Sequence, residues 1–313
     1  MKECTVQAMI LAAGFGTRLL PHTRLRPKPL FPLLNEPLLL LTIRRLQRFG
    51  FGHIIVNCHH LRGQIVDCLH GMAGVVVQEE ETILGTGGGL RQALSLMRDE
   101  PLLVTNGDIY HTIDFRTLYD AHCSTQFPVT LAMHDYPRFN TVQVTDDKVV
   151  AFRPEDENSQ PLAFTGLSVI EPDILHGIEV GRESCIIDHY RRKLNDGVQF
   201  GVFRVDKCFW TDMGTPEDYL ELHAGLLNGS IPRWQEFACG TAEKRILIDD
   251  KARLTGKSCI TDWCAIGAAT GRDISLARCV VWDGVQFPDG YCSADLLVSE
   301  SPHETAAGIA EGN

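Results

Sequence analysis

Long hydrophobic runs are absent from this 313-residue sequence, and the longest candidate, residues 37–43, falls far short of the ~18 to 20 apolar residues of a membrane span. The apolar run at residues 8–13 breaks at Gly14 and is too short for a secretory signal. Basic residues are also scarce, because 29 Lys and Arg face 40 Asp and Glu, for a formal net charge of −11. A general nucleic-acid binder would normally carry a basic face. We therefore expect a globular chain with neither a membrane nor a nucleic-acid partner.

Paired cysteines are absent too. The eleven cysteines are scattered and odd in number, and no C-x-x-C pair occurs. This arrangement argues against a disulfide framework and against a zinc site built on paired cysteines. His53, His59 and His60 lie near one another in the sequence but lack ligand spacing, so we expect no metal there. Reduced, buried thiols indicate a cytoplasmic protein.

Acidic residues are absent from one stretch of this acidic chain. Between Cys4 and Asn35 the only charged side chains are basic, namely Arg18, Arg24, Arg26 and Lys28. A cationic segment in a chain of opposite net charge predicts a polyanionic ligand bound at that segment.

A glycine-rich loop lies inside this basic segment. An apolar run that ends in Ala13 is followed by Gly14, Gly16 and Thr17. The order predicts a buried strand that leads into a tight loop with free backbone N–H groups, because glycine lets the main chain approach a phosphate closely. Two common phosphate loops are excluded, since G-x-G-x-x-G and G-x-x-x-x-G-K-[ST] both need a glycine where Leu19 stands.

Apolar periodicity predicts alternating strands and helices along the first part of the chain. The expected strands are residues 5–12, 54–57, 75–78 and 102–105, and the expected helices are residues 38–50, 59–69 and 90–98. Such alternation is typical of a parallel sheet with crossover helices. From residue 129 to residue 170 apolar and polar residues alternate around a turn at Asp146 and Asp147, which predicts an antiparallel extension of the sheet.

Two stretches carry a family resemblance. Residues 11–21, LAAGFGTRLLP, with residues 27–30, PKPL, resemble the signature of the sugar-1-phosphate nucleotidyltransferases, or nucleotide-sugar pyrophosphorylases. Residues 210–219, WTDMGTPEDY, resemble the W-x-D-x-G-T-P-x-x-Y motif of the same family. The resemblance implies a Rossmann-like α/β fold with a mixed, mostly parallel sheet flanked by helices. It also implies transfer of a nucleoside monophosphate from an NTP to a sugar 1-phosphate, with release of pyrophosphate.

The resemblance assigns roles to four charged residues. Arg18 would bind the leaving pyrophosphate and the α-phosphate, and Lys28 would bind the phosphates at the reacting centre. Asp108 follows an expected strand, and with Asp212 it would bind Mg²⁺, which prefers hard oxygen ligands. The nucleophile is a phosphate oxygen that is already ionised at neutral pH, so no catalytic Ser, Cys or His is required.

Nucleotide binding is expected at two loops. Residues 13–17 would hold phosphates through their N–H groups, and the glycines from Gly85 onward, with Thr86, would open a helix whose N–H groups meet a base edge or a phosphate. Glu80 stands where the family recognises the nucleobase, in place of a common Gln. Glutamate only accepts hydrogen bonds, which suits guanine N1–H and N2–H or uracil N3–H. We favour guanine by a small margin.

The sugar side departs from the family pattern. Arg153 stands where a lysine often binds the sugar phosphate, and Phe152 replaces an acidic residue that commonly contacts sugar hydroxyls. Asn140 stands near the place of a sugar-contacting glycine, and Gly166 belongs to a Phe-Thr-Gly-Leu run. The substrates stay open between GTP with mannose or heptose 1-phosphate and UTP with N-acetylmuramate 1-phosphate. A phosphocholine cytidylyltransferase would need an aromatic cage, which the spacing does not suggest.

The C-terminal part changes in composition. Residues 230–244 are polar and small and are predicted to be a linker, and beyond them apolar pairs recur about every six residues, as in a left-handed parallel β-helix. We therefore expect a catalytic domain at 1–229, the linker, a β-helix-like tail at 245–300 and a disordered end at 301–313. Many family members oligomerise through such a tail, so a homo-oligomer is one option. A regulatory homologue without turnover is the alternative of another class.

Overall fold

The chain divides into two compact units in the computed structural model, which describes residues 6–152, 161–238 and 245–302. Unit 1 comprises Met1–Gly16, Arg26–Pro29 and Thr42–Trp210, and unit 2 comprises Thr17–Leu25, Leu30–Leu41 and Thr211–Asn313. Most of the chain before residue 211 thus belongs to unit 1, and all of the chain after it belongs to unit 2. The domain boundary expected after residue 229 stays a prediction. None of the helices in the described ranges has the length and apolarity that crossing a membrane would need.

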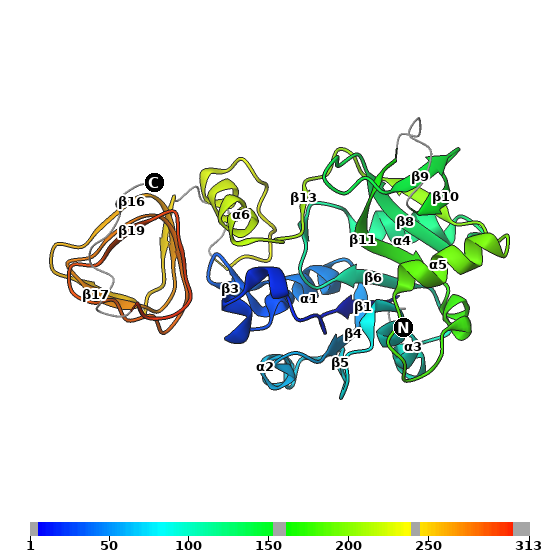
Figure 1. The fold of residues 1–313 in the computed structure, drawn as a ribbon, viewed down its shortest axis with the longest axis horizontal. Helices are drawn as coiled ribbons and strands as arrows, with labels where there is room; N and C mark the ends of the chain where they lie inside the picture. Colours follow the sequence, from blue (N-terminus) through cyan, green and yellow to red (C-terminus); the bar gives the residue numbers. More distant parts are fainter. Residues whose placement is uncertain (1–5, 153–160, 239–244, 303–313) are drawn as a thin grey trace. The chain divides into compact units, whose positions relative to one another are not determined.

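Unit 1 is built on a nine-stranded sheet with the strand order β5-β4-β1-β6-β11-β8-β12-β10-β9 (Figure 1). Its strands are β1 (Val6–Leu11), β4 (Phe51–Cys58), β5 (Val75–Glu79), β6 (Leu102–Asn106), β8 (Val129–His134), β9 (Val142–Thr145), β10 (Lys148–Phe152), β11 (Ala163–Ile170) and β12 (Gly201–Arg204). The strands β5, β4, β1 and β6 are mutually parallel, and β11 is antiparallel to both β6 and β8. The predicted α/β fold with a mixed sheet is confirmed, including the antiparallel extension after residue 129.

Helices cover both faces of this sheet. They are α1 (Leu38–Arg48), α2 (Arg62–Leu69), α3 (Gly85–Ala93), α4 (Phe115–Cys123) and α5 (Ile186–Asn195). On β8, Leu131 and Met133 belong to one buried cluster with Tyr190 of α5, whereas Thr130, next to Leu131, contacts His122 of α4. Because successive side chains of a strand point to opposite faces, α4 and α5 lie on opposite sides of the sheet.

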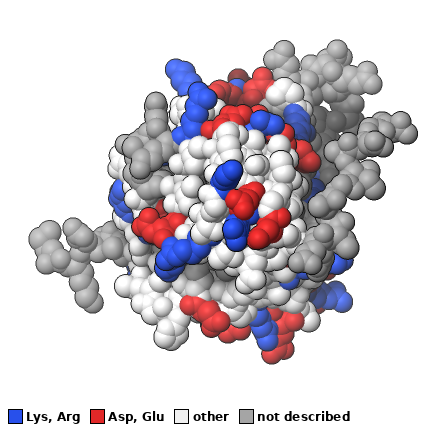
Figure 2. Space-filling view, turned by 90° about the vertical axis from the view of Figure 1, so that its left-hand side faces the viewer, with Lys and Arg blue, Asp and Glu red and all other residues white. Residues whose placement is uncertain are grey.

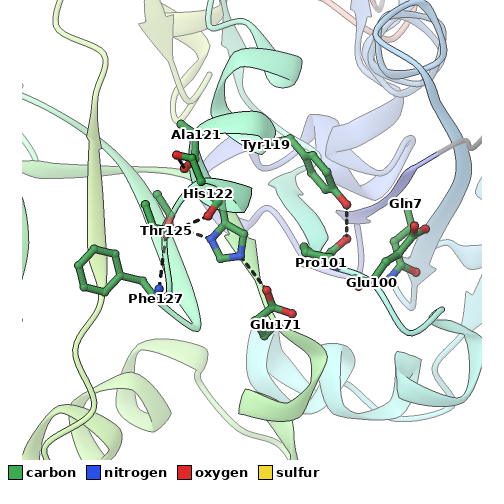
Figure 3. A network of polar contacts seen from close by, with 11 residues as sticks. Gln7, Glu100, Pro101, Tyr119, Ala121, His122, Thr125, Phe127 and Glu171 are labelled. Atoms are coloured by element: carbon green, nitrogen blue, oxygen red, sulfur yellow. Dashed lines mark hydrogen bonds and ion pairs between the residues drawn. The ribbon is translucent and has the colours of Figure 1, made fainter.

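A buried histidine joins α4 to the sheet (Figure 3). His122 Nδ1 lies 2.8 Å from Thr130 Oγ1, and its Nε2 lies 3.3 Å from Glu171 Oε1. Burial lowers the pKa of His122, so the ring is held neutral. On the same helix, the Tyr119 hydroxyl donates to the Pro101 carbonyl at 3.2 Å. These bonds tie α4 to β8, to the residue after β11 and to the residue before β6.

Unit 2 contains the long helix α6 (Pro216–Asn228) and a segment from the N-terminal motif. Thr215 and Asp218 form a capping box at the start of α6, with bonds of 3.1 and 3.2 Å. The Tyr219 hydroxyl donates to the Pro32 carbonyl, and the Phe31 ring lies 5.8 Å from Tyr219. The short elements here are the 3-10 helices Thr17–Leu19 and His22–Arg24, with β2 (Pro32–Leu33) and β3 (Glu36–Pro37).

The predicted linker at residues 230–244 is described as far as residue 238. Within this part Ile231, Trp234 and Phe237 are buried. Ile231 packs on Gly225 of α6, where no Cβ would fit. This part of the segment is therefore packed against its own unit rather than free, because its three large apolar side chains bury their surface there.

The tail is a stack of parallel strands. They are β14 (Ile246–Ile248), β15 (Arg253–Thr255), β16 (Cys259–Ile266), β17 (Thr270–Arg272), β18 (Ser275–Val281), β19 (Cys292–Ala294) and β20 (Leu297–Val298). Successive coils pair in register, for example Cys259 with Ser275 and Ser275 with Cys292, and the coils have a triangular outline (Figure 1). The predicted β-helix-like tail is confirmed. Of the end expected to be disordered, residues 303–313 lie outside the described ranges.

One guanidinium links three coils of the tail. Asp262, Arg278 and Asp295 each adopt a positive φ, of 62°, 53° and 55°. Arg278 Nε and a terminal nitrogen donate to Asp295 at 2.6 and 2.7 Å, and the other terminal nitrogen donates to Asp262 at 3.2 Å. Figure 2 shows the face of the tail, with basic and acidic side chains close together on it.

We predict that Arg278→Met loosens the coils on both sides of β18. The exposed bonds to Asp262 and Asp295 are lost, and faster hydrogen exchange in peptides covering residues 259–298 would report it. Arg253→Met is the matched control, since the Arg253 guanidinium donates to the carbonyls of Asp250 and Ala252 in its own coil. Equal effects of the two substitutions would contradict a role of Arg278 in linking coils.

Candidate functional site

The glycine loop follows the buried strand β1. Ala12 donates its N–H to Asn57 Oδ1 at 2.8 Å, Gly16 has a φ of +62°, and the 3-10 helix that carries Arg18 begins at Thr17. A Cβ placed on Gly14 would meet no protein atom within 4 Å. Protein packing therefore does not require glycine at position 14, which agrees with an open loop available to a ligand.

Arg18 pairs with Asp212 in unit 2. Its terminal nitrogen donates to Asp212 Oδ2 at 3.2 Å, although the two residues lie 194 positions apart. Gly214 makes room for the pair, since a Cβ there would lie 2.5 Å from the Arg18 guanidinium and 2.9 Å from Asp212 Oδ2. The Arg18 side chain is 57% exposed, so the pair contributes little to stability and its guanidinium stays accessible.

Lys28 pairs with Asp108 in unit 1. The Lys28 ammonium donates to Asp108 Oδ2 at 2.6 Å, and its side chain is only 6% exposed. Gly107, between β6 and Asp108, donates its N–H to the Leu11 carbonyl at 2.9 Å. A Cβ on Gly107 would lie 2.9 Å from that carbonyl, so glycine is needed to join the ends of β1 and β6. The predicted turn thus places a carboxylate at the carboxyl end of the parallel strands.

Helix α3 begins at Gly85, five residues before the expected start. The predicted free N–H groups at this end are partly used, because Gly87 and Gly88 donate theirs to the Ser184 carbonyl at 2.7 and 3.3 Å. Thr86 Oγ1 accepts from the Ile186 N–H at 3.0 Å. This end of α3 is thus partly covered by protein, because the segment before α5 packs directly on these glycines. Nucleotide contacts of Gly85 and Thr86 stay predictions.

Glu80 is buried, with 1% exposure. Its Oε1 accepts from Asn57 Nδ2 at 2.7 Å, and its Oε2 accepts from the Leu84 N–H at 3.1 Å. Both carboxylate oxygens therefore have protein donors in this structure. The role of Glu80 at the nucleobase stays a prediction, and its partner Asn57 was not predicted from the sequence.

The residues expected on the sugar side have structural contacts. Gly166 has a φ of +81°, and a Cβ there would lie 2.5 Å from Asn106 Nδ2. Asn140 holds its loop, since Oδ1 accepts from the Tyr136 N–H at 2.8 Å and Nδ2 donates to Asp135 at 2.7 Å. Arg153 lies outside the described residues. Sugar contacts of these three residues stay predictions.

An aromatic cluster around Trp210 was not predicted from the sequence. The Tyr136 ring stacks on His134 at 5.3 Å and on Phe139 at 5.7 Å, and Trp210 meets all three edge-on. The Tyr136 ring thus contacts three other rings of the protein. The cluster packs on itself, which differs from a cage around a quaternary ammonium. No local pattern indicates this cluster, because Trp210 lies far along the chain from the other three rings.

No group of three or more His, Cys, Asp or Glu side chains in the described part of the chain is arranged to hold a metal ion. His53 Nε2 lies 2.8 Å from the Leu96 carbonyl, and His59 Nδ1 lies 3.0 Å from the Glu80 carbonyl. These two rings therefore have backbone partners. The nine cysteines in the described residues are all free thiols.

Known proteins resemble this chain along most of its length. The mannose-1-phosphate guanylyltransferase of Mycobacterium tuberculosis is 29% identical over 306 residues, which cover 91% of this chain and 82% of that protein. The N-acetylmuramate alpha-1-phosphate uridylyltransferase of Neisseria meningitidis serogroup B is 32% identical over 222 residues, which cover 67% of this chain and 94% of that protein.

Solved structures share the fold. HddC from Yersinia pseudotuberculosis, complexed with GMP-PN, superposes with a TM-score of 0.60 at 22% identity and covers 70% of this chain and 98% of its own. The inositol-1-phosphate CTP transferase from T. maritima gives 0.59 at 16% identity, with 73% and 98% covered. The nucleotidyl transferase family matches residues 7–229, which include both motifs and all four charged residues described above. The resemblance seen in the motifs is confirmed, and the chain belongs to the nucleotidyl transferase family.

Proposed function

We propose that this chain is an enzyme that transfers a nucleoside monophosphate from an NTP to a sugar 1-phosphate and releases pyrophosphate, in an Mg²⁺-dependent reaction in the cytoplasm. The observation that carries the proposal is the pairing of each motif cation with a motif carboxylate. Arg18 pairs with Asp212, and Lys28 pairs with Asp108. The relatives named above, which are called guanylyl- and uridylyltransferases, support the same reaction class.

Each ion pair, within its own unit, suits a cation that alternates between a free and a phosphate-bound state. Without ligand, Asp108 compensates the buried Lys28 ammonium, whose charge would otherwise be costly. A triphosphate offers each cation a multiply charged partner, and in that state the carboxylates can turn to a metal ion. Arg18, with its planar set of donors, suits the leaving pyrophosphate.

The chemistry needs positioning and positive charge more than a base. The attacking sugar-phosphate oxygen is already ionised, so the barrier arises from bringing two anions together at the α-phosphoryl group. Lys28 and Arg18 would lower that barrier by holding the anions. The open main chain at Gly14 would let the phosphates approach its N–H groups.

The donor set suits Mg²⁺. Asp108 and Asp212 offer hard carboxylate oxygens, and Mg²⁺ sites commonly combine one or two carboxylates with substrate phosphates and water. When bound, the ion supplies positive charge opposite the developing charge on the phosphoryl group. The assignment of both aspartates to this ion rests on the two motifs.

The substrate pair that we favour is GTP with mannose or heptose 1-phosphate. UTP with N-acetylmuramate 1-phosphate is the alternative, and each option has a similarly named relative. A coupled pyrophosphate assay should test four NTPs against the 1-phosphates of mannose, glucose, heptose and N-acetylmuramate. We expect turnover with a guanine or uracil nucleotide and one of these sugars, and loss of turnover when EDTA removes Mg²⁺.

A nucleotide-sugar-binding regulatory subunit is the alternative of another class. It predicts no pyrophosphate release from any pair in that assay, together with binding of an NDP-sugar. Light scattering on the same preparation would show whether the chain forms a homo-oligomer, and deletion of the tail would show whether residues 245–300 are responsible.

A further inference from the structure

A chain of buried hydrogen bonds joins the glycine loop to the start of α3. The Ala12 N–H donates to Asn57 Oδ1 at 2.8 Å, and Asn57 Nδ2 donates to Glu80 Oε1 at 2.7 Å. Glu80 Oε2 accepts from the Leu84 N–H at 3.1 Å, one residue before α3. Asn57 is 2% exposed and Glu80 is 1% exposed. Three bonds therefore connect the loop after β1 with the loop after β5.

Helix α3 packs closely on this pair. A Cβ on Gly89 of α3 would lie 2.8 Å from Asn57 Nδ2 and 2.8 Å from Glu80 Oε1. The side chains of Asn57 and Glu80 therefore require a glycine at position 89, the third of the Gly87–Gly89 run. Glycine at this position lets α3 pack directly on the two side chains, which holds them in place.

The backbone of Glu80 is held as well. His59 Nδ1, just after the end of β4, donates to the Glu80 carbonyl at 3.0 Å. Arg62 of α2 donates to the same carbonyl at 3.4 Å. Both the main chain and the side chain of Glu80 are therefore committed to protein partners.

We propose that Asn57 and Glu80 are positioning residues, which set nucleotide affinity by fixing the glycine loop relative to the start of α3. Glu80 then acts through Asn57 and Leu84 rather than as a hydrogen-bond acceptor for the base. The inference rests on the proposed function, which identifies the ligand as an NTP whose phosphates bind at the glycine loop.

The directions of the bonds allow a reciprocal exchange. In Asn57→Asp, the donor to Glu80 is lost and two buried carboxylates face each other, which repel unless they take up a shared proton. In Glu80→Gln, the amide can satisfy either Asn57 or Leu84, but it turns a donor toward the other. In the double variant, the aspartate that replaces Asn57 would accept from both Ala12 and the new amide, whose oxygen would accept from Leu84. Every buried donor and acceptor is then paired again.

The test is to measure the dissociation constants of GTP and UTP, without sugar phosphate, and the KM and kcat of the better pair. The variants are N57D, E80Q and the double variant N57D/E80Q. We expect each single substitution to weaken NTP binding by about tenfold, as one unpaired buried polar group does. The ratio of the GTP and UTP constants should stay the same. The double variant should recover most of the affinity.

Asn195→Asp is the matched control, because it makes the same chemical change at an exposed residue at the end of α5. It should leave the nucleotide constants unchanged. Thermal midpoints of all variants separate loss of folding from loss of binding. A single variant that loses stability but keeps wild-type NTP affinity would overturn the proposal, since a merely structural pair behaves in that way.

Two further outcomes are decisive. If Glu80→Gln changes the ratio of GTP to UTP affinity and the double variant does not restore it, Glu80 contacts the base and the inference is wrong. If the wild-type chain binds NTP but releases no pyrophosphate with any sugar 1-phosphate, the proposed function fails. The NTP affinities of N57D, E80Q and the double variant still test the roles of Asn57 and Glu80 in that case. A wild-type chain that binds neither nucleotide overturns both.

Discussion

Replacing Asp108 or Asp212 by asparagine is expected to lower the kcat of nucleotidyl transfer by on the order of 10³-fold while the chain stays folded. Asparagine keeps the size and one oxygen of the side chain but removes the charge that attracts Mg²⁺. Each aspartate accepts a hydrogen bond from a motif cation, so its position is set before any ligand arrives. Pyrophosphate release measured against Mg²⁺ concentration would show the loss of kcat.

Stability must be separated from chemistry in the Asp108 variant. Asp108→Asn leaves the buried Lys28 ammonium without its carboxylate, which destabilises the fold. The double variant Asp108→Asn/Lys28→Met should regain thermal stability but not activity. Asp120→Asn, which breaks the exposed pair with Arg116, serves as the control and should leave kcat unchanged. Unchanged turnover in Asp108→Asn or Asp212→Asn would rule out the metal assignment.

Acid is expected to destabilise unit 2 through His223. The ring is fully buried, its Nδ1–H donates to the Tyr219 carbonyl at 3.0 Å, and its Nε2 accepts from the Leu34 N–H at 3.3 Å. Burial lowers the pKa of His223 from 6.5 to about 4. A proton on Nε2 would place two hydrogen-bond donors, this N–H and the Leu34 N–H, opposite each other. The neutral ring therefore stabilises the fold above pH ~6.5, where the unfolded chain is also neutral.

As the pH falls from about 6.5 to about 4, the unfolded chain takes up the proton first, so stability is lost over this window. The difference between the two pKa values corresponds to about 3 kcal/mol of unfolding free energy at the acid end. Urea unfolding between pH 7 and pH 4 would measure it. His223→Gln keeps an acceptor for Leu34 and should flatten the pH dependence at a lower overall stability.

The exposed His176 provides the control, because His176→Gln should leave the slope unchanged. Other histidines whose pKa values are lowered by burial add to the acid sensitivity with the same sign, so the His223 variant retains a smaller slope: His22, His111, His122, His134 and His189. An identical slope in wild type and His223→Gln would refute the assignment.

The motifs predicted the charged residues but not their pairing. Arg18 and Lys28 were found from a basic stretch without acids, and Asp108 and Asp212 from their motifs. That Arg18 pairs with Asp212 and Lys28 with Asp108 depends on where residues 194 and 80 positions apart meet. No local pattern records such a distance, because it results from how distant parts of the chain fold against one another.

Two helices that pack on the sheet, α4 and α5, were not predicted from the sequence. α4 and α5 have nine and ten residues, which is too short for stability in isolation. Packing stabilises them, through His122 in α4 and Tyr190 in α5. Their formation thus depends on strands that come later or much earlier in the chain.

The sequence alone determined the family, the α/β class, the β-helix-like tail and the main charged residues, because repeats, strand periodicity and phosphate-binding motifs are local patterns. Only the tertiary structure decided which partner each of these residues contacts. It buried Glu80 against Asn57, joined Gly87 and Gly88 to the segment before α5, and packed the segment after the N-terminal motif with α6. These outcomes depend on burial and on partners distant in the chain, which decide whether a polar group bonds to protein or stays available to a ligand.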